Sequence, residues 1–304
     1  MTPDLQAALT RLQEQLQPLR GHKVALAFSA GSDSTLLLTQ LAALYGTGAA
    51  GNDHVAGNDH VAGNDHAHTE GGVYAFLVSS QLHPHADVAE AQALCQQFKV
   101  PLEVLTLNEL PAIANNPPER CYLCKKELMS LLWRQAKEKQ CTHLIDGTNA
   151  SDLLVYRPGL RAIKELQVFS PLAEANITKA QVRGLLEELK LAAAQKPSAP
   201  CLATRFAYNS TLNVETMRQI EEVETKLHAQ GLYNVRVRVY PQEHIVRLEV
   251  DPEAIAQVVA QREEIVALLR SITGYLYFCL DLEGFTSGSM DKALKLEGRE
   301  FKCP

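Results

Sequence analysis

The sequence predicts an α/β protein with a doubly wound parallel sheet, followed by a smaller C-terminal α/β domain. Apolar runs typical of buried strands alternate with segments of helical periodicity. Two later runs alternate strictly between apolar and polar residues, which is typical of half-buried strands. The buried strands are expected at 24–28, 73–78, 102–105 and 142–145, and the half-buried ones at 235–239 and 246–250.

Helical segments separate these strands. Leucines recur at helical spacing from Leu5 to Leu19 and predict an amphipathic helix that covers the first strand. The segment 192–198 is expected to be a connector, which divides the chain into domains at 1–195 and 196–304. Further helices are expected at about 34–45, 84–98, 122–139, 178–191 and 214–230.

A low-complexity insertion interrupts the first domain at about 46–72. Gly-Asn-Asp-His-Val-Ala occurs at 51–56 and 57–62, and Gly-Asn-Asp-His recurs at 63–66. With almost no bulky apolar side chains, this segment is expected to be a disordered surface loop that arose by tandem duplication. Its His and Asp residues leave open a metal-holding, non-enzymatic role.

Composition narrows the function classes. The net charge of −6 over 304 residues argues against nucleic acid as a partner, because binding to phosphate backbones needs clustered Lys and Arg. Charged residues within 1–20 argue against a signal peptide or a membrane span, so a cytoplasmic protein is expected. Seven cysteines in such a compartment suggest thiols, metal ligands or catalysis rather than disulfides.

Polar segments follow three of the predicted strands. They are Ser29–Ser34, Ser79–Ser80 and Asp146–Asn149. The carboxyl ends of parallel strands meet at one sheet edge, so we expect all three segments to lie together there. The first segment places backbone N–H groups and hydroxyls at a helix N-terminus, which favours a phosphate site, although an ordinary capped turn is an alternative.

The cysteines divide into patterned and unpatterned ones. Cys121 and Cys124 have CxxC spacing at the start of a predicted helix, which is typical of a metal pair or a low-pKa dithiol. A structural zinc site or a redox dithiol therefore remains open. Cys95 and Cys279 lie in apolar segments and are expected to be core residues. Neither Cys141 nor Cys303 carries a usable pattern.

Two arginines share one face of the strand at 235–239. Its valines occupy one side, and Arg236 and Arg238 the other. Such a pair is most often a solvated face, but forked guanidinium groups also recognise carboxylates. Glu222 and Glu224 cannot be distinguished from the charged face of an exposed helix.

A family resemblance rests on these motifs together. The loop Ser-Ala-Gly-Ser-Asp-Ser resembles the Ser-Gly-Gly-x-Asp-Ser loop of pyrophosphatase-loop (PP-loop) ATPases, with Ala30 where that pattern has Gly. An alanine methyl group is tolerated there only at negative φ. Joined with the loop, five further motifs resemble the LarE family, ATP-dependent sulfur transferases of nickel-pincer cofactor biosynthesis. These motifs lie at 120–125, 146–152, 156–161, 200–205 and 282–289.

The resemblance implies roles for particular residues. It implies ATP binding with Mg²⁺, for which Asp33 is a candidate ligand, and substrate binding by Arg205, Arg236 and Arg238. Cys121, Cys124 and Cys201 are implied to be catalytic and to hold a [4Fe–4S] cluster, because three thiolates leave one iron open to sulfide. The implied ATP-binding residues are Ser29, Ala30, Gly31, Ser32, Asp33, Ser34, Gly147, Thr148, Asn149 and Asp152.

The implied activity is sulfur insertion in two half-reactions. ATP would adenylate a carboxylate of pyridinium-3,5-biscarboxylic acid mononucleotide, and a sulfur would then convert it to a thiocarboxylate and release AMP. Expected partners are this nucleotide-like substrate, further copies of the chain and a sulfide or sulfur donor protein, but no nucleic acid and no membrane. A PP-loop tRNA thiolase and an amide-forming synthetase are the alternatives.

Overall fold

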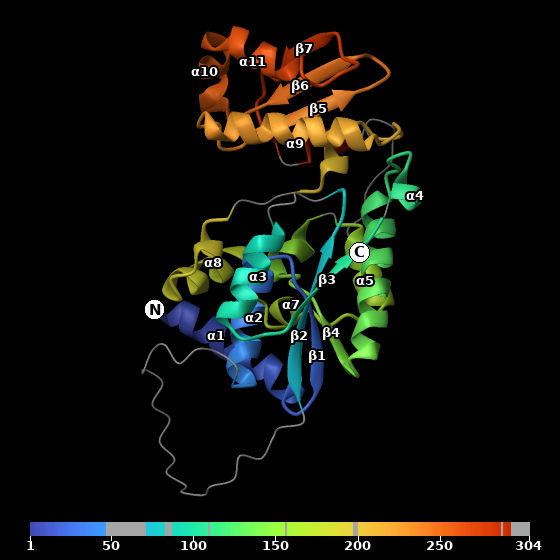
Figure 1. Ribbon diagram of the computed structural model, residues 1–304. Coiled ribbons are helices and arrows are strands. Elements are labelled where there is room, and N and C mark those ends of the chain that lie inside the picture. The colour runs from blue at the N-terminus through green and yellow to red at the C-terminus, as the bar shows by residue number, and fades with distance from the viewer. Residues whose placement is uncertain are drawn as a thin grey trace, which may run out of the picture.

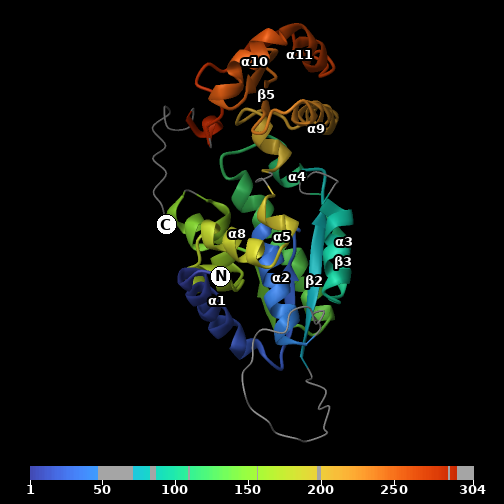
Figure 2. The same cartoon turned by 90° about the vertical axis from the view of Figure 1, so that its left-hand side faces the viewer.

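The computed structural model describes residues 1–46, 71–82, 87–108, 110–155, 157–196, 200–286 and 288–292. Two sheets with their own helices are stacked one above the other (Figure 1). The same two-tier arrangement is visible after a 90° turn, with α9 lying between the lower sheet and the upper one (Figure 2). We call the junction between the two tiers the waist.

The lower sheet is parallel and has the strand order β3-β2-β1-β4. In the central strand β1, Val24 lies opposite Val73 on one side and His143 on the other. The sequence therefore predicted an α/β fold with a parallel sheet correctly. The strands are β1 (Lys23–Ala27), β2 (Gly72–Ser79), β3 (Leu102–Thr106) and β4 (His143–Ile145).

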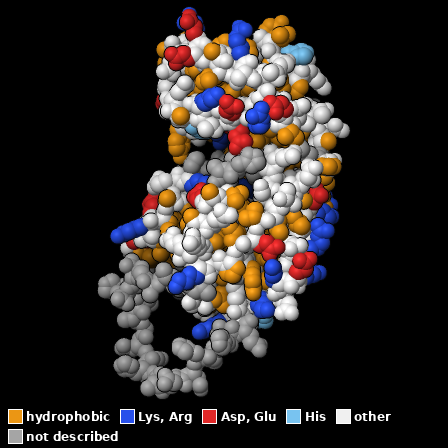
Figure 3. All heavy atoms as spheres, viewed as in Figure 1, with side chains coloured by type: hydrophobic (Ala, Val, Ile, Leu, Met, Phe, Trp, Pro, Cys, Tyr) orange, Lys and Arg blue, Asp and Glu red, His pale blue; other side chains and the backbone are white. Residues whose placement is uncertain are grey.

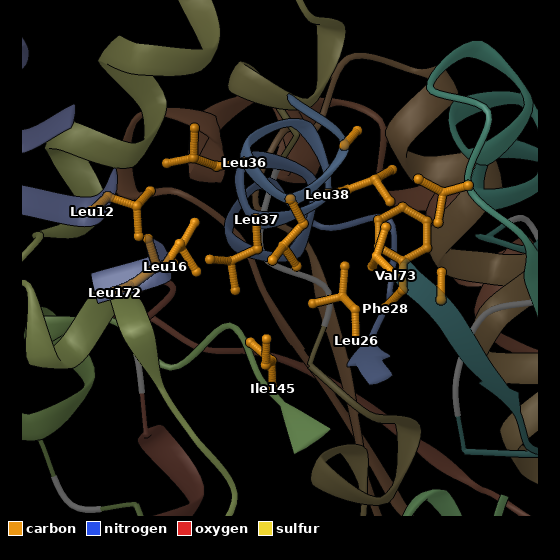
Figure 4. Close-up of a cluster of buried hydrophobic side chains, with 14 of the residues drawn as sticks. Leu12, Leu16, Leu26, Phe28, Leu36, Leu37, Leu38, Val73, Ile145 and Leu172 are labelled. Atoms are coloured by element: carbon orange, nitrogen blue, oxygen red, sulfur yellow. The ribbon is translucent and has the colours of Figure 1, made fainter. Parts of the chain in front are cut away.

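Helices cover both faces of this sheet. Alternate residues of β1 serve different cores: Val24 and Leu26 pack with the first group of helices, and Ala25 with the second. Figure 4 shows the first core, where the leucines of α2 meet those of α1 and the strands. The first group comprises α1 (Pro3–Leu16), α2 (Ser32–Leu44), α3 (Asp87–Gln97) and α8 (Lys179–Glu188), and the second α5 (Arg120–Glu138) and α6 (Gly159–Glu165).

Shorter helical segments complete the lower tier. The predicted connector begins with the short 3₁₀ helix η3, whose Ala193 and Ala194 are buried in the first core, so this part belongs to the lower tier. The remaining segments are η1 (Gln17–Leu19), η2 (Ala150–Leu154), α7 (Pro171–Glu174) and η3 (Ala192–Ala194), whereas α4 (Leu110–Ile113) lies at the waist, where Ile113 is buried in the core of the upper tier (Figure 1).

The upper sheet has the order β5-β6-β7, with β5 antiparallel and β7 parallel to the central strand β6. The two predicted strands are confirmed, but the third, β7, was not predicted. The elements of this tier are η4 (Leu202–Arg205), α9 (Val214–Ala229), β5 (Arg236–Tyr240), β6 (Ile245–Glu249), η5 (Pro252–Ala254), α10 (Ile255–Ala260), α11 (Arg262–Leu269), β7 (Tyr277–Leu280) and η6 (Ser289–Asp291).

Side-chain burial bears out one cysteine expectation and overturns another. Cys95 is buried in the first core as expected, whereas Cys279 is exposed because it lies on β7 at the edge of its sheet. Apart from Gly46, Gly71 and Gly72, the insertion at 46–72 lies outside the described residues, and so does Cys303. In the described part of the chain, no helix is both long and apolar enough to cross a bilayer.

Candidate functional site

The loop 29–34 closes on itself at the start of α2. The backbone N–H of Ser29 donates to Oγ of Ser34 at 3.3 Å, and this hydroxyl donates to the carbonyl of Gly31 at 3.2 Å. Gly31 is the residue that precedes the first turn of α2. The loop therefore presents the N-terminal end of a thirteen-residue helix, where the unpaired N–H groups and the helix dipole favour an anion.

Ala30 adopts the conformation that the sequence analysis considered intolerable. Its φ is +53°, in the left-handed region, and its side chain is fully buried in the first core. The expectation of a negative φ is therefore wrong. Left-handed backbone costs an alanine about 1–2 kcal/mol. The carbonyl of Ala30 accepts a hydrogen bond from Nζ of Lys196 at 3.2 Å, and burial of the methyl group also opposes that cost.

The three polar segments meet at one edge of the lower sheet, as expected. They line a cavity of about 340 Å³ at the carboxyl ends of the strands. The predicted ATP-binding residues Ala30, Ser32 and Asn149 do not line it; Asn149 donates to Asp33 of the loop, and Ser32 accepts from Lys179. The polar lining includes Ser29, Gly31, Asp33, Ser34, Ser79, Ser80, Asp146, Gly147, Thr148 and Asp152.

Asp33 is held by two side chains from other elements. Nδ2 of Asn149 donates to Oδ1 of Asp33 at 3.0 Å, and Nζ of Lys179 donates to Oδ2 at 2.5 Å. The same ammonium group donates to the Ser32 hydroxyl at 2.7 Å. Each carboxylate oxygen accepts one hydrogen bond here and keeps a further lone pair, so Asp33 stays a candidate Mg²⁺ ligand.

Gly147 allows the second polar segment to approach the loop. A Cβ at this position would lie 3.0 Å from Cβ of Asp33 and 3.2 Å from the backbone nitrogen of Ser34. Asp146 is buried and accepts from the Thr148 hydroxyl at 2.7 Å, which fixes the strand end. The segment 146–149 therefore packs directly against the loop.

Asp152 and Arg157 bring a charged pair to the cavity. The Asp152 carboxylate accepts from the backbone N–H of Asn149 at 3.1 Å and pairs with Arg157 at 2.8 Å. Both residues line the cavity, together with Lys125 of α5. Two cationic side chains therefore line a cavity for which the sequence predicted mainly hydroxyl and backbone groups.

Helix α5 connects this cavity with the thiols. Lys125, Leu128 and Met129 line the cavity, and Cys124 directly precedes Lys125. Cys121 lies four residues before Lys125, which is about one turn and about 6 Å along the helix axis at 1.5 Å per residue. The CxxC pair is at the start of a helix, as expected, with Cys121 exposed and Cys124 partly buried.

Backbone hydrogen bonds at the waist bring Cys201 toward α5. The N–H of Leu202 donates to the carbonyl of Leu82 at 2.8 Å, and the N–H of Leu212 to Ala114 at 2.8 Å. Nδ2 of the buried Asn116 donates to the carbonyls of Phe206 at 3.0 Å and Ala207 at 2.8 Å. The first bond attaches the segment after Cys201 to the segment that follows β2, and the others attach it to the segment just before α5.

The Cys201 thiol is close enough to Cys121 for the two to interact electrostatically. Burial raises the pKa of Cys201 and Cys121 raises it further, whereas the charge of Arg120 and the N–H groups of Thr204 and Ala203 lower it. The net shift is upward, so the thiol is protonated at neutral pH. Within the described ranges, no three His, Cys, Asp or Glu side chains lie close enough to hold a metal ion.

The predicted substrate arginines are buried rather than exposed. Nε and Nη2 of Arg205 donate to the two carboxylate oxygens of Glu224 at 2.9 and 2.7 Å. Arg238 donates to Glu249 at 3.0 Å and to the carbonyl of Thr204 at 2.8 Å. The alternative of a solvated face is excluded because η4 and η6 contact this side of β5, whereas substrate binding by these arginines stays a prediction.

Arg236 lies beside this network. Its guanidinium donates to the carbonyl of Val235 at 2.7 Å and lies 5.1 Å from the centre of the Phe285 ring. Burial, together with the charges of Arg205 and Arg238, lowers the pKa of Arg236 to about 10, against the raising effect of Glu224 and Glu249. Three buried guanidinium groups outnumber two buried carboxylates here, so this region beside the waist has an excess of positive charge. The residues are Arg205, Arg236, Arg238, Glu224 and Glu249.

Several residues that shape the site were missed from sequence. Glu224 is buried and accepts from the N–H of Val237 at 2.8 Å, at the edge of its sheet. For Lys179 a signal existed: a lysine at the first position of a helix opposes the helix dipole. The set comprises Arg120, Lys125, Arg157, Lys179, Lys196, Glu224 and Glu249.

Comparison with known proteins identifies relatives of this chain. The chain is 31% identical to the pyridinium-3,5-bisthiocarboxylic acid mononucleotide synthase of Lactiplantibacillus plantarum over 274 residues, which is 90% of each chain. It belongs to the LarE family, to which that synthase belongs. Because so little of this LarE-family chain is unaligned, the similarity includes both sheets.

Two further relatives share parts of the LarE-family chain. An uncharacterized protein of Synechocystis is 38% identical over 221 residues, 71% of this chain and 81% of the relative. An uncharacterized protein of Methanocaldococcus jannaschii is 32% identical over 192 residues, 63% of this chain and 73% of the relative. A scan against models of protein families gives no match.

The buried ion pair predicts different effects for two neighbouring glutamates. Replacing Glu224 with Gln leaves Arg205 without a carboxylate partner, so the free energy of unfolding should fall by about 3–5 kcal/mol. Glu222→Gln, which breaks only an exposed pair with Lys226, should change it by less than about 0.5 kcal/mol. Urea unfolding measures both, and equal effects would contradict the assignment of Glu224.

Proposed function

We propose that this chain is an ATP-dependent sulfur insertase that converts a carboxylate of pyridinium-3,5-biscarboxylic acid mononucleotide into a thiocarboxylate. The observation that carries the proposal is that one helix, α5, lines the cavity at the sheet edge and carries the CxxC pair one turn away. The name of the Lactiplantibacillus relative supports the substrate and the sulfur product. We propose that the two tiers correspond to domains at 1–195 and 196–304.

In the first half-reaction, ATP binds as PP-loop enzymes bind it. The pyrophosphate would lie on the loop 29–34, where the α2 N-terminus and Lys179 favour negative charge. Lys125 and Arg157 would add charge from the other wall. A substrate carboxylate oxygen attacks the α-phosphorus, the bond to pyrophosphate breaks, and an acyl-adenylate forms. Mg²⁺ would screen the triphosphate and stabilise the departing pyrophosphate.

In the second half-reaction, a sulfur nucleophile attacks the acyl carbon. A carbon–sulfur bond forms, the carbon–oxygen bond to the adenylate breaks, and AMP leaves, so attack by the Cys201 thiolate gives a thioester. Loss of the Cα proton of residue 201 and cleavage of its Cβ–Sγ bond then release the thiocarboxylate and leave dehydroalanine, to which sulfide can add to restore the cysteine. Cys201 and Cys121 are the thiols that the waist brings into electrostatic contact. Because the pKa of Cys201 is raised, its proton must leave before or during attack. A sulfide or sulfur donor protein would restore the sulfur after turnover.

A [4Fe–4S] cluster as the sulfur source requires three thiols that lie close enough together to bind it. Three cysteines suit such a cluster chemically. As they lie, Cys121, Cys124 and Cys201 do not fit it, because the described residues hold no three-ligand group. The cluster stays a prediction, tested by anaerobic purification with iron and sulfide analysis. About four irons per chain would support it, and less than one in material that transfers sulfur would exclude it.

Substrate recognition by the arginines is proposed in a more specific form. Every guanidinium nitrogen of Arg205 and Arg238 already has a protein acceptor, so these residues fix the segment 200–205 through Glu224 and Glu249. Direct binding of a carboxylate by either residue requires an exchange of partners. Arg236 would contribute positive charge to the same region. Oligomerisation also remains a proposal.

Lys179 offers the first test of the ATP site. Lys179→Met removes the ammonium group beside Ser32 and Asp33, so the dissociation constant for ATP should rise about tenfold or more, equivalent to at least about 1.4 kcal/mol. Isothermal titration calorimetry measures it. Lys137→Met, an exposed change late in α5, is the matched control. Unchanged ATP affinity in Lys179→Met would contradict the proposed phosphate site.

Cys201→Ala separates the two half-reactions. Thiocarboxylate formation should fall to background because the nucleophilic sulfur is lost, whereas substrate-dependent pyrophosphate release should continue until the adenylate accumulates. Mass spectrometry of the products and a pyrophosphate assay measure the two. Cys279→Ala removes an exposed thiol on β7 and should leave both intact. Thiocarboxylate formation by Cys201→Ala would remove this thiol from the mechanism.

A further inference from the structure

Arg120 is a buried cation that the proposed reaction does not use. It is the first residue of α5 and only 4% exposed. Its Nε and Nη1 find no hydrogen-bond partner anywhere in the described ranges. A buried guanidinium group with two nitrogens that lack an acceptor is destabilising, so its presence calls for a functional explanation.

Its observed contacts offset only part of that cost. The guanidinium carbon lies 4.2 Å from the centre of the Tyr208 ring, a cation–π contact that stabilises the charge. The Tyr208 hydroxyl donates to Asp291 at 2.7 Å, so this carboxylate is engaged by the phenol. Among the ion pairs of the described residues, none joins Arg120 to an acidic side chain.

The backbone adds positive potential at the same place. Arg120 begins a nineteen-residue helix whose first turn contains no acidic residue. The N-terminal end of a helix dipole disfavours a cation and favours an anion. Both nitrogens are shielded from solvent, so bulk water does not replace the missing acceptor. Glu119 stands at the N-cap of this helix, so the two guanidinium nitrogens without a partner are the observation that points to a negatively charged ligand.

The thiols lie around this charge. Cys121 follows Arg120 in the chain, and the charge of Arg120 acts on the Cys201 thiol and on the Tyr208 phenol. A group bound to Arg120 would therefore lie beside the sulfurs that the proposed reaction uses. A planar guanidinium group matches a carboxylate or thiocarboxylate better than an ammonium group does.

We propose that Arg120 is an anion receptor that binds a carboxylate or thiocarboxylate group of an aromatic acid and holds it beside Cys121 and Cys201. The proposal rests on the proposed function for the identity of the acid, but the receptor itself rests on the burial and missing partners of Arg120. Binding of the anionic group would offset the desolvation cost of the guanidinium group. The affinity for the substrate would therefore depend on the positive charge at position 120.

Calorimetry with pyridine-3,5-dicarboxylate as the probe tests the receptor in the full chain. Arg120→Met should weaken binding about tenfold or more, and Arg120→Lys should recover part of it. Arg134→Met, an exposed change on the same helix, should stay within about twofold of wild type. Equal binding by wild type and Arg120→Met would overturn the proposal. So would inorganic phosphate competing as strongly as the dicarboxylate.

A stability measurement excludes a merely structural role. Because Arg120 is unpaired, Arg120→Met should keep or raise the Tm and leave ATP binding unchanged. A fall of more than about 5 °C would overturn the receptor in favour of a structural role. Wild type that binds the probe through Arg120 but forms no substrate-dependent AMP would refute the proposed function alone. Normal sulfur transfer with no Arg120-dependent probe binding would refute the receptor alone.

Discussion

The packing of α5 against the parallel sheet fixes the distance between the two halves of the candidate site. Met129, Leu132 and Ala136 bury one side of the helix in the second core, so the helix cannot slide without opening that core. Its middle lines the cavity at the strand ends, and its first turn reaches the waist. The proposed nucleotide site at the sheet edge and the CxxC thiols at the waist are thereby kept within one or two helical turns of each other.

The waist concentrates buried charge around this turn. Arg205 and Arg238 are paired with Glu224 and Glu249, which fixes the segment after Cys201 at the expense of desolvating both partners. Arg120 has no such partner among the described residues. The outer surface is different, since cationic and anionic side chains are intermixed on the face in view (Figure 3). Positive charge is thus gathered at the waist, where a dicarboxylate substrate would need it.

The sequence predicted those features of the fold and the site that depend on residues close together in the chain. The strands, the loop 29–34 and the meeting of the polar segments follow from apolar runs and from where parallel strands end. Partners distant in sequence were beyond it: the segment after Cys201 meets the segment before α5 through tertiary hydrogen bonds such as Leu212 to Ala114. Glu222 and Glu224 look alike in sequence, yet two positions turn a helix by about 200°, so one is exposed and the other buried. Ala30 shows that tertiary burial can hold an alanine at positive φ.

The central step of the proposed reaction is the activation of a substrate carboxylate by ATP, through adenylation, before sulfur arrives. Pyridinium-3,5-biscarboxylic acid mononucleotide labelled with ¹⁸O in its carboxylates tests it most directly, with the AMP product analysed by mass spectrometry. Attack on the α-phosphorus followed by loss of AMP transfers one labelled oxygen to each AMP formed. Unlabelled AMP, or ADP as the product, would contradict adenylation and with it the joint role of the cavity and the thiols.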